Sequence, residues 1–356
     1  PAGAYRIANL PPGTYKVTAE ADGLLAEWRS VTVLAGCDTP AVDFRLGDPP
    51  AGAALLSAAI PGAALRGETM EISLTFANIG ESTWRRGDGY CLERAGCDSP
   101  ISAMPERADL VPGEEIAPGG ERGFSVSLPV PDTVGFYETA WQMCQQGGAG
   151  PFGDVARGTI SVTSFLDVPA DHWAVSEIEA AQAAGVVCGY ADHRYQPLAA
   201  VTRDQMAVYL ARALAGGDEC VPTGPARPSF VDIPADYWAY RHVEYVQSRD
   251  VAQGYDDGCY HPDYPLDRAQ MAVFMARGVA GGEGGLSDYV APDTPSFSDV
   301  PTDFWAYRHV EYLAALGVVA GYAEGSYCPG YICSRDQMAV YVTRAFDLTG
   351  AVSPAR

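Results

Sequence analysis

Lysine is almost absent from this chain of 356 residues, because Lys16 is the only one and arginine supplies nearly all of the other basic side chains. Acidic residues outnumber basic residues by 45 to 23, which gives a formal net charge of −22 and a pI near 4.4. A chain with so many acidic residues is not expected to bind the phosphate groups of nucleic acid. Recognition of any anion would depend on the bidentate guanidinium group of arginine.

Long apolar runs are also missing. No run approaches the roughly 18 residues of a membrane-spanning helix, so we expect no membrane insertion. The chain opens on Pro1 without a start methionine or a signal peptide, and we interpret it as a piece of a longer protein. Its length predicts two or three domains.

Cysteine occurs nine times, and no two cysteines form a CxxC pair or a tight zinc-binding group. The interpretation that we favour is disulfide bonding in an oxidising compartment. Cys328 with Cys333 is the best local pair, and Cys91 or Cys97 with Cys144 is the next. The acidic loop residues do not have the spacing of an EF-hand, so no metal and no cofactor are expected.

An internal repeat fills the C-terminal half of the chain. Its first signature, Phe-x-Asp-x-Pro-x-Asp-x-Trp, begins at Phe165, Phe230 and Phe297. The tryptophans that close it are 238 − 173 = 65 and 305 − 238 = 67 residues apart. A second signature, Arg-x-Gln-Met-Ala, follows about 30 residues later in each copy. A fixed period of this kind indicates supersecondary units that bury their faces against one another.

The second signature opens on a capping-box pattern, in which a short polar residue is followed three residues later by Gln. The pairs are Thr202 with Gln205, Asp267 with Gln270, and Ser334 with Gln337. We therefore predict that a helix begins at each pair and that these six residues are structural. The first helix of the first repeat is predicted to be capped by Asp171 and to end at Gly185.

Three arginines, Arg203, Arg268 and Arg335, occupy the first position of these predicted helices. A cation there opposes the helix dipole, so its recurrence needs a reason. One reason is an anion site, in which free N–H groups and a guanidinium fork converge on a ligand. The alternative is an ion pair that braces the fold. The candidate carboxylates for such bracing are Asp167, Asp232 and Asp299.

Trp173, Trp238 and Trp305 close the first signature of each repeat. They are either core anchors between the repeats or the walls of a sugar-binding groove. The tyrosines that follow Gly in the loops are candidates for the same groove: Tyr190, Tyr255 and Tyr322.

The N-terminal half reads as two β regions. In residues 1–47 the segments 15–19, 31–33 and 42–46 alternate in the manner of strands. Residues 3–17 resemble the second half of the carboxypeptidase regulatory-like (transthyretin-like) β-sandwich. In residues 51–163, strands are predicted around 71–76 and 124–128. With Trp84 and Trp141, which we interpret as core aromatics, this region resembles the FW-type immunoglobulin-like domain.

The two signatures of the repeat resemble those of three consecutive S-layer homology domains. The boundaries that we predict are 164–216, 229–281 and 296–349. The resemblance implies a mainly α fold with a pseudo-threefold arrangement, after two all-β sandwiches of which the first is incomplete. It also implies grooves between the repeats that bind an acidic, for example pyruvylated, cell-wall glycopolymer through Arg203, Arg268, Arg335 and the three tryptophans. Because Asp267 precedes Arg268, we expect that site to be the weakest anion binder.

The resulting hypothesis is an extracellular, non-enzymatic protein that is anchored non-covalently to the bacterial cell surface, with the β-domains as spacers. Its expected partner is a cell-wall polysaccharide or a peptidoglycan-linked glycan. The alternative is a structural subunit of an S-layer or filament that self-associates through the β-domains. An enzyme is not expected, because the recurring acids Asp171, Asp236 and Asp303 indicate a role in the fold and no catalytic motif is present.

Overall fold

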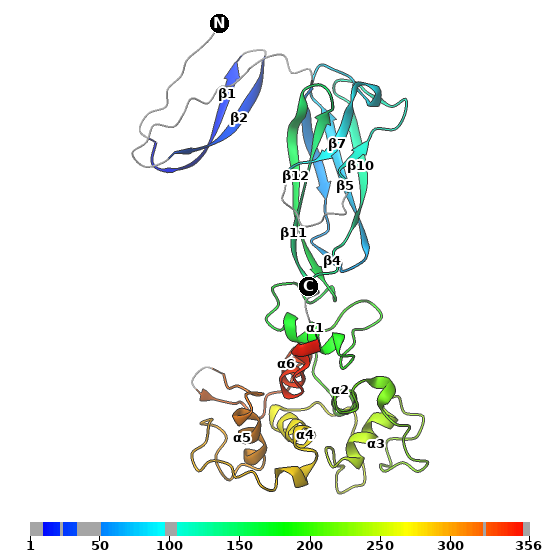
Figure 1. The fold of residues 1–356 in the computed structure, drawn as a ribbon, viewed down its shortest axis with the longest axis vertical. Helices are drawn as coiled ribbons and strands as arrows, with labels where there is room; N and C mark the ends of the chain where they lie inside the picture. Colours follow the sequence, from blue (N-terminus) through cyan, green and yellow to red (C-terminus); the bar gives the residue numbers. More distant parts are fainter. Residues whose placement is uncertain (1–9, 22–23, 34–50, 97–104, 323–324, 352–356) are drawn as a thin grey trace. The chain divides into compact units, whose positions relative to one another are not determined.

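The computed structural model of the chain describes residues 10–21, 24–33, 51–96, 105–322 and 325–351 (Figure 1). The chain divides into two compact units: residues 1–131 with 136–160, and residues 132–135 with 161–356. The first unit is built from strands and the second is mainly helical, which confirms the predicted multidomain order of all-β before mainly α. Within the described ranges, none of the helices combines the length and the apolar character needed to cross a membrane.

The first β region is a hairpin. Strands β1 (Gly13–Ala21) and β2 (Leu24–Val33) pair antiparallel, with Gly13 opposite Val33 and Tyr15 opposite Val31. These strands contain two of the predicted runs. The third run, 42–46, lies outside the described residues, and so does Cys97.

The second β region forms two main sheets and a short two-stranded one. One main sheet has the order β10-β5-β3 and the other the order β4-β12-β11-β7-β8, while β6 pairs with β9. The bounds of these elements are β3 (Ala53–Ala59), β4 (Ala63–Leu65), β5 (Thr69–Asn78), β6 (Trp84–Arg85), η1 (Arg86–Asp88), β7 (Tyr90–Arg94), β8 (Arg107–Asp109), β9 (Glu115–Ile116), β10 (Glu121–Pro129), β11 (Gly135–Gln145) and β12 (Gly150–Thr163).

The alternation predicted for this region holds, because every second residue of β5 and β10 is buried, as in one half-buried face of a sheet. Trp84 and Trp141 are fully buried, as expected of core aromatics. Cys91 of β7 lies opposite Cys144 of β11 in the strand register. Both are buried free thiols in the structure, and burial raises the pKa of Cys144 to about 12.

The helical unit repeats a pair of α-helices three times, as α1 with α2, α3 with α4 and α5 with α6 (Figure 1). Their bounds are α1 (Val175–Ala183), α2 (Arg203–Ala215), η2 (Asp218–Cys220), α3 (Tyr240–Ser248), α4 (Arg268–Ala280), η3 (Glu283–Leu286), α5 (Tyr307–Ala315), α6 (Arg335–Ala345) and η5 (Leu348–Ala351). The prediction that Asp171 caps the first helix is wrong. Turns occupy that segment, since His172 N donates to Pro169 O and Val175 N donates to His172 O. Gly185 does follow the end of α1, with φ of 68°.

A closed ring of backbone hydrogen bonds joins the three repeats. Val201 N donates to Cys333 O, Cys333 N donates to Leu266 O, and Leu266 N donates to Val201 O, at 3.0, 2.9 and 2.9 Å. The three residues occupy the same position of successive repeats, and their side chains are all fully buried. Each repeat therefore contacts both others around one centre.

This ring bears on the disulfide predicted between Cys328 and Cys333, because both are free thiols in the structure. Cys333 takes the place of Val201 and Leu266 in the ring, and burial raises its pKa to about 12. The backbone N–H of Cys328 is bonded to Asp299 Oδ2 at 2.7 Å in a loop. We therefore interpret Cys333 as a small apolar core residue.

Candidate functional site

The predicted site residues gather where the repeats meet. Three junctions are named here by the repeats that form them. Junction 1–2 joins the start of α2 to the second repeat, junction 2–3 joins the start of α4 to the third, and junction 3–1 joins the start of α6 to the first. The antiparallel bridges Thr202 to Pro265, Asp267 to Ile332 and Ala200 to Ser334 cross them.

The first backbone N–H groups of these helices are not free. Arg203 N donates to Tyr264 O at 3.0 Å, and Asp204 N donates to Pro262 O at 3.1 Å. The equivalent bonds close the other two junctions, at 2.9 to 3.0 Å. The expectation that free N–H groups bind an anion is therefore wrong. The next repeat already satisfies these donors, which a helix end would otherwise leave without partners.

The predicted caps differ among the three helices. Asp267 and Gln270 form a capping box, in which Asp267 Oδ1 accepts from Gln270 N at 2.7 Å. At α2 the hydroxyl of Thr202 instead donates to Asp204, whose Oδ1 accepts from Gln205 N at 2.7 Å. The box predicted for Thr202 and Gln205 is therefore wrong, because the acid two residues further on takes the first-turn N–H.

At α6 the two arrangements are combined. Ser334 N donates to Gln337 Oε1 at 3.5 Å, while the hydroxyl of Ser334 donates to Asp336. Asp336 Oδ1 accepts from Gln337 N at 2.7 Å. The six residues predicted as caps thus surround the helix starts, and a carboxylate is the main acceptor at each one.

The side chains of the three arginines form hydrogen bonds across the junctions. Arg203, Arg268 and Arg335 are 4, 2 and 4% exposed. The Nε of each donates at 2.8 Å to the carbonyl of a tyrosine in the next repeat. The Nη2 of each donates to a second carbonyl of the same repeat, at 2.9 to 3.1 Å. These contacts hold the loop of one repeat against the helix start of another.

Aromatic rings enclose the same guanidinium groups. Arg203 Cζ lies 4.5 Å from the ring centre of Tyr260 and 4.8 Å from that of Tyr255. Arg268 and Arg335 lie 4.3 to 5.1 Å from the equivalent rings. One tyrosine of each pair lies nearer the surface and is 40 to 44% exposed: Tyr190, Tyr255 and Tyr322. Its ring separates the buried guanidinium group from water. Cation–π attraction is strongest for such desolvated cations.

Ion-pair bracing by the aspartates of the first signature is not observed. Asp167, Asp232 and Asp299 each accept two backbone N–H groups of their own repeat's loop, at 2.7 to 2.8 Å. Their carboxylates fix the loop that carries the tyrosines. The arginines bond neutral oxygens instead, so three buried cations have no carboxylate partner among the described residues.

One arginine has fewer partners than the other two. Arg268 Nη1 donates to the hydroxyl of Tyr341, and Arg335 Nη1 donates to that of Tyr209. The equivalent ring at junction 1–2 is Phe274, which lies 5.3 Å from Arg203 Cζ and carries no hydroxyl. Within the described ranges, Arg203 Nη1 therefore has no hydrogen-bond acceptor.

The three tryptophans are exposed at the surface of the junctions. Trp173, Trp238 and Trp305 are 61, 59 and 60% exposed, so the core-anchor interpretation is wrong. Trp238 Nε1 donates to Asp204 Oδ2 at 3.1 Å, and Trp173 Nε1 donates to Asp336 Oδ2 at 3.0 Å. Two of these exposed indoles are therefore fixed by a carboxylate on the neighbouring repeat.

Junction 2–3 has no such carboxylate, because Ala269 stands where the other helices have Asp204 and Asp336. The residue before each tryptophan changes with it. Tyr237 donates to Asp204 Oδ2 at 2.7 Å, and His172 Nε2 lies 3.8 Å from Asp336 Oδ2. The equivalent residue at junction 2–3 is Phe304, so an acid and its polar neighbour are both replaced by apolar residues.

Two partly buried ionic clusters, in each of which the histidine is buried, support the helices away from the junctions. Asp218 bonds Arg212, Arg241 and His242. Burial would raise the pKa of Asp218, but the hydrogen bonds from Arg212 and His242 outweigh it and hold the pKa at about 2. Burial lowers the pKa of His242 more than Asp218 raises it. Sequence reasoning found the equivalent histidines but not this cluster, since its members come from different helices.

Three segments match the model of the S-layer homology domain: residues 164–207, 229–272 and 296–339. Cell surface glycoprotein 1 of Acetivibrio thermocellus is 29% identical over 163 residues, which cover 45% of this chain and 7% of that protein. The cellulosome-anchoring protein of the same organism is 26% identical over 167 residues, or 46% of this chain and 36% of that one.

S-layer protein EA1 of Bacillus anthracis is 27% identical over 180 residues, which cover 50% of this chain and 20% of that protein. The chain thus spans 7 to 36% of the length of these relatives. Among solved structures, the NMR structure of the CARDB domain of PF1109 from Pyrococcus furiosus covers 32% of this chain and 94% of its own, at 12% identity and a TM-score of 0.24. So low a score carries no argument about the β region.

Proposed function

From the premise that three S-layer homology domains occupy residues 164–339 of an extracellular cell-surface protein, we propose that this chain anchors itself non-covalently to the bacterial envelope. The ligand is an acidic glycopolymer of the cell wall, and the β-domains act as spacers. The role is one of binding and not of catalysis. One relative, the cellulosome-anchoring protein of Acetivibrio thermocellus, carries a name that describes a role of this kind.

The observation that carries this proposal is the exposure of one tryptophan at each junction, since each of these residues is 59 to 61% exposed. A single exposed aromatic side chain would need no explanation, but here a tryptophan is exposed to the same extent at the same position of all three repeats. An indole offers an apolar face to a sugar ring and a polar N–H at its edge. The half-exposed tyrosine above each buried arginine extends the same surface, and the cation beneath it attracts an acidic group.

We further propose that junction 2–3 binds the acidic group of the glycan. Asp204 and Asp336 put a carboxylate beside the tryptophan at the other two junctions, where it repels an anion. Ala269 removes that charge, and Trp305 Nε1 has no acceptor among the described residues, so it can donate to the ligand. Asp267 is also charged and caps its helix, as Asp204 and Asp336 do, but among the described residues no hydrogen bond joins it to Trp305, whereas Asp204 and Asp336 bond their tryptophans directly. This reverses the expectation that the Arg268 site is the weakest anion binder.

The test is co-sedimentation of the purified chain with isolated cell-wall sacculi. We expect Trp305→Ala and, separately, Ala269→Asp to weaken binding by about tenfold or more, as the loss of roughly 1.4 kcal/mol or more requires. Trp173→Ala is the matched control, because it removes an equally exposed indole from a junction that keeps its carboxylate, and its effect should be smaller.

Thermal melts of each variant separate lost binding from lost folding. Binding unchanged in all three variants would overturn the anchoring surface as proposed. Equal losses at both junctions would leave anchoring intact and overturn the assignment to junction 2–3.

A second function, that of a subunit in a lattice or filament, is favoured by one observation. In the described residues, strands β1 and β2 form a sheet of only two strands. A lone hairpin is marginal in water, and strands from another chain could complete it by edge addition. Sedimentation velocity of residues 51–351 and of the whole chain tests this. Monomers in both would contradict assembly, and oligomers of the whole chain alone would support it.

A further inference from the structure

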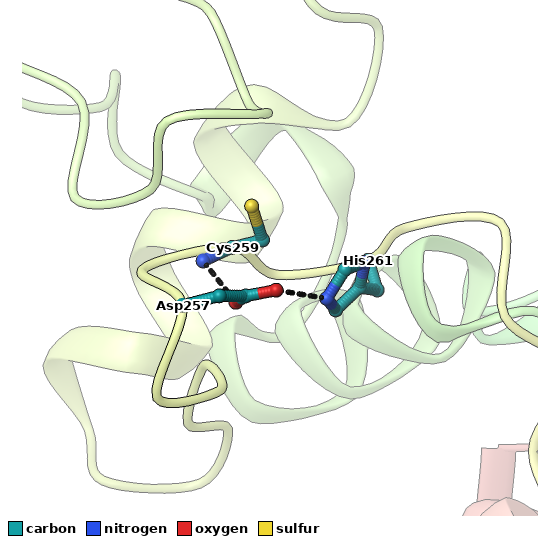
Figure 2. A group of neighbouring side chains, drawn as sticks. All are labelled: Asp257, Cys259 and His261. Atoms are coloured by element: carbon teal, nitrogen blue, oxygen red, sulfur yellow. Dashed lines mark hydrogen bonds and ion pairs between the residues drawn. The ribbon is translucent and has the colours of Figure 1, made fainter.

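The loop between α3 and α4 of the second repeat gathers three side chains that can bind a metal ion (Figure 2). Asp257 lies in a turn, and the left-handed backbone of Gly258 and His261, with φ of 78° and 55°, bends the loop so that the groups of Asp257, Cys259 and His261 come close together. Tyr260 between them is fully buried. A carboxylate oxygen, the thiol sulfur and an imidazole nitrogen all lie within 4.8 Å of one another.

Existing contacts already orient these groups. Asp257 Oδ1 accepts from Cys259 N at 2.9 Å, and Asp257 Oδ2 lies 2.8 Å from His261 Nε2 (Figure 2). The imidazole stacks on Tyr264, with ring centres 4.5 Å apart and planes 6° from parallel. Donor atoms around a tetrahedral zinc ion, with bonds of about 2.0–2.3 Å, lie roughly 3.3–3.8 Å apart. To reach that geometry, Asp257 Oδ2 and His261 Nε2 would move apart slightly from 2.8 Å, and the Cys259 sulfur, which points away from them in Figure 2, would turn toward them.

The fold requires neither the thiol nor the imidazole, whereas Asp257 makes the same loop bond as Asp192, whose Oδ1 accepts from Arg194 N at 3.2 Å. The equivalent positions of the first repeat hold Asp192, Arg194 and Gln196. Gln196 and His261 have nearly the same left-handed backbone, with φ of 57° and 55°. The loop thus forms equally well without a thiol and an imidazole, so an explanation in terms of folding alone is insufficient for the second repeat.

We propose that Asp257, Cys259 and His261 form a three-ligand site for a zinc-class divalent cation, with its fourth position open to water. Thiolate and imidazole ligands select zinc-like ions over calcium and magnesium, which prefer oxygen. A thiolate, a carboxylate and a neutral imidazole together balance the charge of the ion. Because the ion binds the thiolate form of cysteine, binding releases the thiol proton and tightens as the pH rises.

The same loop holds junction 1–2 together. Tyr260 O accepts from Arg203 Nε at 2.8 Å, and Tyr260 OH donates to Arg203 O at 2.9 Å. An ion bound on either side of Tyr260 would stabilise this connection, so the metal should raise the melting temperature of the helical unit. The site is separate from glycan binding at junction 2–3, and its test does not depend on that proposal.

The experiment titrates the whole reduced chain with Co²⁺, which reports a thiolate ligand through a charge-transfer absorption band. We expect one equivalent of Co²⁺ to produce the band and Zn²⁺ to abolish it, while Ca²⁺ leaves it unchanged. Cys259→Ser should remove the band. His261→Gln copies the residue of the first repeat and should weaken binding by at least roughly tenfold, since even changes outside the ligand shell cost 10–100-fold.

Cys220→Ser is the control, because Cys220 is an exposed free thiol in the segment between the first and second repeats. It should leave the band and the affinity unchanged. A wild-type chain without the band, or a band that survives Cys259→Ser, would overturn the proposal. Because His261→Gln keeps the backbone of a loop that folds elsewhere in the chain, its loss of binding cannot be ascribed to unfolding if its melting curve in metal-free buffer matches that of wild type.

Discussion

The junction arginines show how a buried cation can be accommodated without a carboxylate. Each donates to two backbone carbonyls and lies between aromatic rings. Hydrogen bonds from charged donors contribute about 1.5–3 kcal/mol each, and a buried acceptor left without a donor costs a similar amount. We therefore expect Arg→Ala at a junction to unfold the repeats before it reports on a ligand. The exposed tryptophans are better probes of binding.

Among the described residues, Arg203 Nη1 has no tyrosine hydroxyl beside it to accept a hydrogen bond, and this difference leads to a prediction for a single residue. Phe274→Tyr should supply the acceptor that Tyr341 and Tyr209 provide to the other two arginines, and should raise the free energy of unfolding by about 0.5–1.5 kcal/mol. The reverse change, Tyr341→Phe, should lower it by a similar amount. Urea unfolding followed by circular dichroism measures both. A destabilised Phe274→Tyr would mean that the junction has no room for the hydroxyl.

The group of Asp257, Cys259 and His261 was not predicted from the sequence, and the reason lies in the types of these residues. Cysteine spacing alone gives no pair, because the three ligands are of three different types. The signal that could have found them is their alternate spacing, Asp257-x-Cys259-x-His261, in one loop only.

The starts of α2, α4 and α6 use one backbone geometry with two different caps. The residue before each helix has an extended backbone, with φ between −89° and −80°. Asp267 caps α4 with its own carboxylate, whereas Asp204 and Asp336 serve α2 and α6 from inside the first turn. The capping carboxylate of α4 is therefore two residues earlier in its repeat than those of α2 and α6. The position of the negative charge at the junction differs accordingly.

Cap replacement should therefore affect the helices unequally. Asp267→Ala removes the main acceptor of α4, and we expect it to lower the free energy of unfolding by about 1 kcal/mol, within the usual 0.5–2 kcal/mol for a lost cap. Thr202→Ala is the matched control and should cost less, because Asp204 still accepts from Gln205 N. Denaturant midpoints compare the two. Equal losses would contradict the assignment of the α2 cap to Asp204.

At the scale of the whole helical unit, ring closure and the two ionic clusters add to the stability that the common apolar core provides. Each repeat depends on both others through the hydrogen bonds of Val201, Leu266 and Cys333. The second cluster, around Glu283, bonds Arg277 and His309 in the manner of the first. Burial lowers the pKa of His309 more than Glu283 raises it. Both clusters thus contain a histidine that resists protonation in the folded state.

Acidification should destabilise this unit in two steps. The pKa values of His242 and His309 lie below their ordinary value of about 6.5 in the folded chain. The unfolded chain therefore binds protons first as the pH falls below that value, which favours unfolding. The pKa of Asp218 is about 2 instead of 3.8, so its contribution is present above pH 4 and is lost between about pH 4 and 2.

Differential scanning calorimetry from pH 7 to pH 3 checks this, and the melting temperature should fall throughout. His242→Gln combined with His309→Gln should flatten the decline between pH 7 and 5 and leave the decline at lower pH. A melting temperature that rises on acidification would contradict the assigned directions.

Local pattern was enough for much of this chain. The repeat period, the positions of α2, α4 and α6, and the alternating strands β5 and β10 were all predicted, because hydrophobic period and turn residues act over a few neighbours. The start of α1 was misjudged, since the turns after Phe165 are fixed by the backbone hydrogen bonds of that segment. The environment of the arginines could not be predicted, because Arg203 meets Tyr260 across 57 residues and Arg335 meets Tyr195 across 140.

The amino-acid sequence by itself determined that three like units follow a strand-rich half, and which residues begin their second helices. Only the tertiary structure decided that the arginines are buried, that the tryptophans are exposed, and that one junction lacks the carboxylate present at the other two. The physical reason is that burial and charge at a junction depend on a partner surface from another repeat. That surface is created only when the three repeats close their ring.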